Sequence, residues 1–132
     1  SAFGEHVICE EVEAAMLKAA NEQNIKITEF TVAPMIAQGD GKSYHEWLVE
    51  FEDTPANLGE FEKKIDDNLR QKNVYYDDLI KGNILQPLKI TSLQKNGFIN
   101  YMKSQGKLGG QNKVPRLSND RIIADELKNY LQ

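Results

Sequence analysis

The ten residues Ser43–Glu52, "SYHEWLVEFE", decide the fold of this chain. Polar and apolar side chains alternate along them, and a period of two residues is typical of a β-strand. One face of that strand would carry His45, Trp47, Val49 and Phe51, and the other Tyr44, Glu46, Leu48 and Glu50. We therefore predict a strand here, with the face of Trp47 turned towards a core.

The sequence before and after this segment predicts two more strands. Residues 25–36, "IKITEFTVAPMI", are rich in β-branched and aromatic residues, and the turn signal "GDGKS" at Gly39–Ser43 joins the two strands as an antiparallel hairpin. Residues 85–93, "LQPLKITSL", predict a third strand with Leu88 and Ile90 pointing inward. Because helical segments separate it from the hairpin, we expect a helical crossover to a parallel neighbour.

Helical periodicity accounts for most of the remaining sequence. Helices are predicted over residues 8–23, from an N-cap at Thr54 to about Leu69, over residues 74–82, around Phe98 to Met102, and after a cap at Ser118 or Asn119. The predicted fold is α+β: a three-stranded mixed sheet, made of an antiparallel hairpin plus one crossover strand, with helices packed against it. We expect residues 1–132 to form a single domain.

Composition narrows the classes of function. The chain has 132 residues, 40% of them hydrophobic, which suffices for one core. Its net charge of −4, with both signs interspersed, argues against nucleic-acid binding. No apolar stretch is long enough to cross a membrane. The single cysteine, Cys9, favours a reducing compartment, and we expect it to be a small buried residue at a helix start. These features predict a cytoplasmic protein with no nucleic-acid or membrane partner.

Familiar catalytic and metal-binding patterns are missing from the sequence. His6, His45 and Cys9 lack the spacing of zinc ligands, so no metal site is predicted. His45 shares a strand face with Trp47 and is interpreted as a hydrogen-bonded core histidine. The stretch "GKLGGQNK" at Gly106–Lys113 lacks the spacing of a phosphate-binding loop. The patterns alone predict an α+β domain and assign it no function.

One loop nevertheless concentrates unusual residue types. In Gly109–Arg116, "GGQNKVPR", the glycine pair permits unusual backbone angles, and Pro115 biases Val114 towards an extended conformation. Two cations, Lys113 and Arg116, therefore lie on a non-helical arm beside a flexible joint. Their spacing alone is that of ordinary surface cations.

Several stretches together resemble a known family. They are "YHEWLVEFE", the run from Asn73 that includes "PLKI" at Pro87–Ile90 and then "KVPR" at Lys113–Arg116, and "FGE" at Phe3–Glu5. The combination resembles the C-terminal domain of the auxin-responsive acyl-acid-amido synthetases, in particular the bacterial relatives. That family belongs to the acyl-adenylate-forming superfamily, and the resemblance covers nearly the whole chain.

The resemblance implies an ATP-dependent ligase that joins a carboxylic acid to an amino acid. The acid would react with ATP to give an acyl-adenylate, and the amine would then displace AMP. ATP and Mg²⁺ are implied for the full-length enzyme, and no cofactor is expected in the isolated domain. The large N-terminal domain, which would be the partner in cis, is expected to be missing from this chain. The chain alone should then be an inactive, mobile lid.

The resemblance also implies roles for individual residues. Lys113 matches the lysine that reaches the reacting carboxylate and phosphate during adenylation. Arg116 would be a second phosphate contact or an internal ion pair, and Gly109 and Gly110 would allow close backbone approach to the nucleotide. Phe3, Gly4 and Glu5 match the hinge between the large and small domains.

A second class of function remains open from the sequence. Small α+β sheets also serve as free-standing modules that sense small molecules or bind proteins. A lid should show a one-sided surface that contains Lys113 and the Phe3–Glu5 end. A sensing module should instead dimerise through a sheet edge or a helix face.

Overall fold

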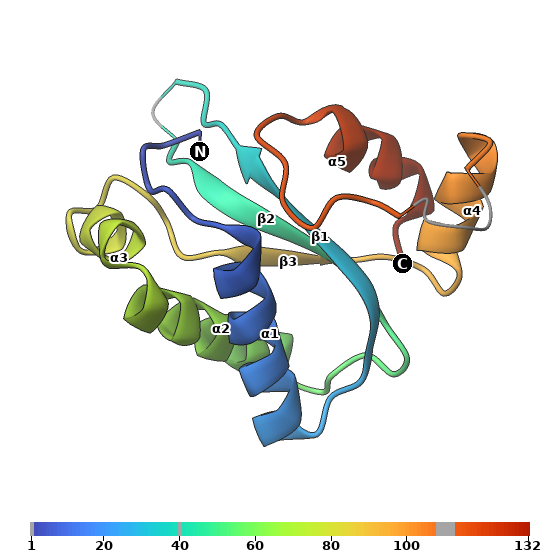
Figure 1. Cartoon of the computed structure of the whole chain (residues 1–132), viewed down its shortest axis with the longest axis horizontal. Helices are drawn as coiled ribbons and strands as arrows, with labels where there is room; N and C mark the ends of the chain where they lie inside the picture. The colour runs from blue at the N-terminus through green and yellow to red at the C-terminus, as the bar shows by residue number, and fades with distance from the viewer. Residues whose placement is uncertain (1, 40, 108–112) are drawn as a thin grey trace.

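The computed structural model describes residues 2–39, 41–107 and 113–132. A three-stranded sheet lies between two groups of helices (Figure 1). The strands are β1 (Ile27–Met35), β2 (Tyr44–Phe51) and β3 (Lys89–Ser92), in the spatial order β1-β2-β3. β2 is antiparallel to β1 and parallel to β3. This arrangement confirms the predicted mixed sheet, and the predicted hairpin and crossover strand are both present.

Strand β2 is the centre of the structure and is buried on both faces. Trp47 pairs with Val32 of β1 and with Ile90 of β3, so it lies in the middle of the sheet. Every residue from His45 to Phe51 is buried. Trp47, Val49 and Phe51 belong to one core, whereas Leu48 belongs to a second core on the opposite face. The alternation in the sequence therefore sorts side chains between two cores.

The first face of the sheet is covered by α1 (Cys9–Gln23), α2 (Leu58–Lys72) and α3 (Val74–Lys81) (Figure 1). The apolar stripes of α1 and α2 point into this core, as their spacing predicts. The fully buried members are Val12, Ala15 and Ala19 from α1 and Phe61, Ile65 and Leu69 from α2. Leu88 and Ile90 are also buried here, which confirms their inward orientation.

The second face is covered by α4 (Gly97–Ser104), α5 (Ile122–Leu127) and the short 3₁₀ helix η1 (Lys128–Tyr130) (Figure 1). The core on this side is smaller. It consists of Ala33, Leu48, Leu93, Phe98, Tyr101, Ala124 and Leu127. The helices of the last third of the chain thus cover the face opposite to α1 and α2, and the sheet becomes the middle of three layers.

Three local predictions are wrong at the helix starts. Thr54 does not cap α2: Asn57 does, because its Oδ1 accepts the Glu60 amide at 2.9 Å, and the Thr54 hydroxyl instead accepts from Gln132. Neither Ser118 nor Asn119 caps the last helix, since Asp120 Oδ1 accepts the first amide of α5 at 3.1 Å. Cys9 is exposed at the start of α1 rather than buried, because the apolar stripe begins one turn later.

Candidate functional site

The arm of "KVPR" lies along the outer edge of β1. The Val32 amide donates to the carbonyl of Arg116 at 2.9 Å, and the Ser118 amide donates to the carbonyl of Val32 at 2.9 Å. Leu117 thereby forms a parallel bridge with Val32. The hydroxyl of Thr31 donates to the carbonyl of Pro115 at 2.6 Å. Proline favours this extended backbone. The segment after Lys113 therefore pairs with the free edge of β1 through these backbone hydrogen bonds.

Arg116 fixes this arm through its side chain. Its guanidinium donates to a carboxylate oxygen of Glu29 and to the carbonyl of Phe30, and it lies over the Phe30 ring, 4.1 Å from the centroid. A weaker contact, 3.4 Å from Nε, joins it to Glu13 of α1. Of the two roles that the resemblance implies for Arg116, the internal ion pair is formed in this structure. The phosphate contact stays a prediction.

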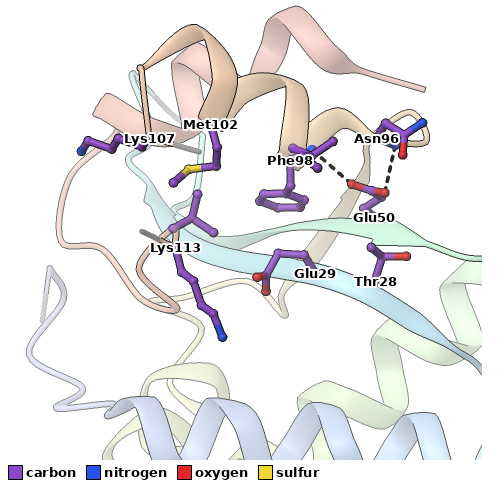
Figure 2. A pocket seen from close by; sticks show the side chains of 10 residues that line it. Thr28, Glu29, Glu50, Asn96, Phe98, Met102, Lys107 and Lys113 are labelled. Atoms are coloured by element: carbon purple, nitrogen blue, oxygen red, sulfur yellow. Dashed lines mark hydrogen bonds between the residues drawn. The ribbon is translucent and has the colours of Figure 1, made fainter. Parts of the chain in front are cut away.

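Lys113, in contrast, is not held by any other side chain that the structure describes. It is exposed, and it makes no hydrogen bond or ion pair to any residue in the described ranges. It lines a surface pocket of about 380 Å³ together with Glu29, Glu50, Phe98 and six other residues. Figure 2 shows its side chain extending beyond the arm, on the same side as the Glu29 carboxylate. An exposed ammonium beside a pocket is available to an anionic ligand.

Gly109 and Gly110, the other two predicted phosphate-contact residues, lie outside the described residues. Their role stays a prediction.

The predicted hinge residues differ in how tightly they are held. Glu5 is 1% exposed, and its Oε2 lies 3.3 Å from Nε2 of His45 on β2. The ring of Phe3 packs against the same imidazole at a centroid distance of 5.6 Å. Gly4 has a φ of +79°, in the left-handed region that glycine favours, and open space around it. The hinge stays a prediction, and Glu5 is anchored in the core.

The segment that directly follows the arm lies beside Glu5 of the predicted hinge. Glu5 and His45 line a small cavity together with Leu117, Ser118 and Asn119. Phe3 and Leu117 also pack against the same core cluster. Two segments more than a hundred residues apart in the sequence are therefore neighbours at the end of the sheet where the chain begins.

His45 is buried, as predicted, but its Nδ1 has no hydrogen-bond partner among the described residues. Its ring stacks on Tyr76 at 5.4 Å with an angle of 7°, in addition to the Glu5 contact. The Tyr76 hydroxyl in turn donates to Asp66, which also accepts the Leu88 amide at 3.2 Å. Within the described residues no group of three His, Cys, Asp or Glu side chains could hold a metal ion. Those residues also include no helix that is long and apolar enough to cross a membrane.

Two buried carboxylates on β2 have roles that the sequence does not reveal. Glu46 accepts hydrogen bonds from Lys128, Thr91 and Arg121. Burial alone would raise the pKa of Glu46, but these three hydrogen bonds outweigh burial and hold its pKa below the ordinary value. Glu50, four residues on, accepts the amides of Asn96 and Phe98 at the start of α4 (Figure 2). In the sequence, the two glutamates appear only as polar members of the strand's polar–apolar alternation.

The chain matches one protein family by sequence and shares its fold with solved structures. The model of the GH3 family C-terminal domain matches residues 10–122. No curated protein matches the chain by sequence. One similar solved structure is a GH3.15 acyl acid amido synthetase, with a TM-score of 0.69 and 17% identity over 93% of this chain. Another, the AtGH3.15 acyl acid amido synthetase in complex with 2,4-DB, has a TM-score of 0.69 and 13% identity over 93% of this chain.

These two structures share the fold of this chain, which spans 23% and 24% of their respective lengths. The family match rests on 113 of the 132 residues and confirms the resemblance seen in the sequence. The chain belongs to the GH3 family, and it corresponds to that family's C-terminal domain.

Proposed function

We propose that this chain is the mobile C-terminal lid of an ATP-dependent acyl-acid amido synthetase. Family membership supports the class of enzyme, and the chain's small share of the similar structures supports a larger protein with a further domain in cis. The observation that carries the proposal is the exposed ammonium of Lys113, which has no partner among the described residues, on an arm that is otherwise firmly docked on β1. A lid needs such an arrangement, because its charge must reach a neighbouring active site.

The proposed reaction has two steps. In the first, a carboxylate oxygen attacks the α-phosphorus of ATP, forming an acyl-phosphate bond while pyrophosphate leaves with its electron pair. In the second, the nitrogen of an amino acid attacks the acyl carbon, loses a proton, and AMP leaves. The reacting groups and the phosphates would lie in the large domain, which supplies the pockets for nucleotide and acid.

Lys113 would serve the first step. Two negatively charged reactants approach each other when a carboxylate meets a triphosphate, and a cation at that point stabilises the charge of the transition state. The residues of this domain fit an anionic nucleotide, because Lys113 is exposed and Glu29, a carboxylate that lines the same pocket, is paired with Arg116. We assign Mg²⁺ to the phosphates of ATP and to residues of the large domain.

The proposal further includes an intracellular setting and a lid motion. The domain would cover the nucleotide during adenylation and rotate before amide formation, which excludes water from a hydrolysable intermediate. The cavity that Glu5 shares with Leu117, Ser118 and Asn119, the residues directly after the arm, supports this motion, since a rotation about the chain start would carry the arm with it.

The test compares Lys113→Ala with wild type in the complete protein that contains this chain. Adenylation is measured as exchange of pyrophosphate into ATP, and amide formation from acyl-adenylate added directly. We expect adenylation to fall by about 10²-fold or more while amide formation is retained. Lys107→Ala is the matched control, since this exposed lysine lines the same pocket from the end of α4 and should matter less.

Two unchanged half-reactions in Lys113→Ala would remove the catalytic role of the arm. The chain on its own should show no pyrophosphate exchange, and exchange by the chain alone would contradict the lid. A ligand-dependent dimer of the chain, measured by its mass in solution, would favour the free-standing sensing or protein-interaction module instead.

A further inference from the structure

We infer that Glu29 is a positioning residue for Lys113, and that it acts through Arg116. The inference rests on the proposed function of Lys113 in adenylation. Glu29 lies on β1, three residues before Val32, where the arm joins the sheet. No part of Glu29 needs to touch a substrate for this role. The Glu29 carboxylate holds the Arg116 side chain in place, and Arg116 in turn holds the arm on β1.

The contacts around Arg116 form a rigid clamp. Its Nη1 donates to both the Glu29 carboxylate and the backbone carbonyl of Phe30, while the Phe30 ring supports the guanidinium plane. The side chains of Arg116 and Glu29 are 26% and 25% exposed, so water screens this pair less than it screens a fully exposed pair. The guanidinium group is planar and rigid, so Arg116 loses little side-chain freedom for each hydrogen bond that it forms. Arg116 can therefore hold the arm in one position.

The clamp limits where Lys113 lies. Only three residue steps separate Lys113 from Arg116, and an extended chain covers at most about 10 Å in that distance. The Pro115 carbonyl between them accepts from Thr31 at 2.6 Å, which fixes the arm at a second point. The backbone of Lys113 is therefore held close to the pocket that its side chain lines with Glu29.

The pair of Glu29 and Arg116 also determines which anion is available to interact with Lys113. Glu29 and Glu50 are the two carboxylates that line this pocket. Glu50 is occupied by the amides of Asn96 and Phe98, and Glu29 is occupied by Arg116. Without Arg116, the Glu29 carboxylate would keep the Phe30 amide but lose its cationic partner, and it would attract the Lys113 ammonium that lines the same pocket. The clamp thus keeps the Lys113 charge available to an external anion.

The first experiment measures docking of the arm in the complete protein by amide hydrogen exchange. In Glu29→Gln we expect faster exchange at Val32 and Ser118, whose amides join the arm to β1. Glu13→Gln is the matched control: it also contacts Arg116, but only at 3.4 Å and from a side chain that is 57% exposed. It should cause the smaller change. Equal exchange in Glu29→Gln and wild type would overturn the inference.

The second experiment measures the two half-reactions. Glu29→Gln should lower kcat for adenylation about tenfold, with a smaller change in KM for ATP and with amide formation retained, because only a misplaced Lys113 is involved. Equal losses in both half-reactions, together with a lower melting temperature, would indicate a merely structural role and overturn the inference. Unchanged adenylation in Glu29→Gln would do so as well.

A double variant keeps the inference testable if the single variants lose stability. Arg116→Gln leaves Glu29 free to pair with Lys113, so Glu29→Gln combined with Arg116→Gln should recover part of the adenylation lost in Arg116→Gln alone. No recovery would overturn the electrostatic part of the inference. Lys113→Ala in the same assay separates the two proposals: a normal rate there refutes the proposed function, whereas a low rate there with a normal rate in Glu29→Gln refutes only the positioning role.

Discussion

Glu50 on β2 closes the N-terminus of α4 with both of its carboxylate oxygens. Oε2 accepts the Asn96 amide at 2.9 Å, and Oε1 accepts the Phe98 amide at 3.1 Å. The side chain of Asn96 makes no capping bond, and its backbone is left-handed at φ 66°. A carboxylate from the middle strand thus replaces the local cap that a helix usually has, and it is also favourable to the helix dipole.

Removal of this carboxylate should destabilise the fold. In Glu50→Ala the buried amide of Phe98 and the part-buried amide of Asn96 lose their acceptor, and we expect a loss of about 1–3 kcal/mol in the free energy of unfolding. This loss is measured as a shift in the midpoint of urea unfolding between variants that share the same m-value. Glu52→Ala changes an exposed glutamate two residues away and is the control. If both variants unfold at the same denaturant concentration, Glu50 is not the cap that holds α4.

Glu46 should give the domain a dependence on acid pH. Its pKa in the folded state lies below the ordinary value of 4.5, so its contribution to stability is complete above that value and is lost as the pH falls through the folded pKa. Glu46→Gln should therefore be less stable than wild type at pH 7, and the difference should shrink in acid. Thermal melts between pH 7 and pH 3 test this. A difference that stays constant with pH would contradict the assignment.

Asp66 should behave in the opposite way. Burial raises the pKa of Asp66 above the ordinary value of 3.8, despite hydrogen bonds from Tyr76 and Leu88 that act to lower it. A raised folded pKa means that the contribution of this group is largest below pH 3.8 and is lost as the pH rises through the folded value. In Asp66→Asn, Oδ1 can still accept both hydrogen bonds. The stability of this variant relative to wild type should therefore rise with pH, and a relative decline would refute the prediction.

Glu5 should hold the start of the chain on the sheet. Glu5→Ala leaves His45 without its carboxylate neighbour in a buried site, and we expect a loss of about 1–3 kcal/mol. Residues before Val7 should then become sensitive to limited proteolysis. Glu10→Ala, at an exposed position on α1, is the control. Equal resistance of the two variants to proteolysis would show that Glu5 does not anchor this segment.

The sequence predicts the sheet well because strand and helix periods are local properties. The alternation in Ser43–Glu52, the stripes of α1 and α2, and the parallel return of β3 all appear as expected. Helix caps were harder to predict, since Asn57 and Thr54 are both good capping residues and only the path of the chain decides between them. Sequence patterns identify the arm as a loop, but they cannot show that it runs along β1.

Local sequence patterns cannot predict which residues pair with the buried and half-buried charged side chains. Glu29 and Arg116 are 87 residues apart, and Glu46 is bound to Arg121 and Lys128, which follow it by 75 and 82 residues. Contacts over such separations depend on the complete fold. The role that we propose for Lys113 rests on resemblance to a family, because a lysine on a loop has no distinguishing local pattern.

The parallel bridge between Val32 and Leu117 has a consequence for solubility. A sheet of three strands exposes two rows of unpaired backbone groups, and such rows can recruit strands from other molecules. Here the row on β1 is occupied around Val32 by the arm, and on β3 the Ile90 amide donates to Glu62 at 2.7 Å. A variant that releases the arm would uncover the edge of β1. We expect self-association through that edge to accompany any loss of the arm's position, because the same few contacts cover the backbone of β1 around Val32.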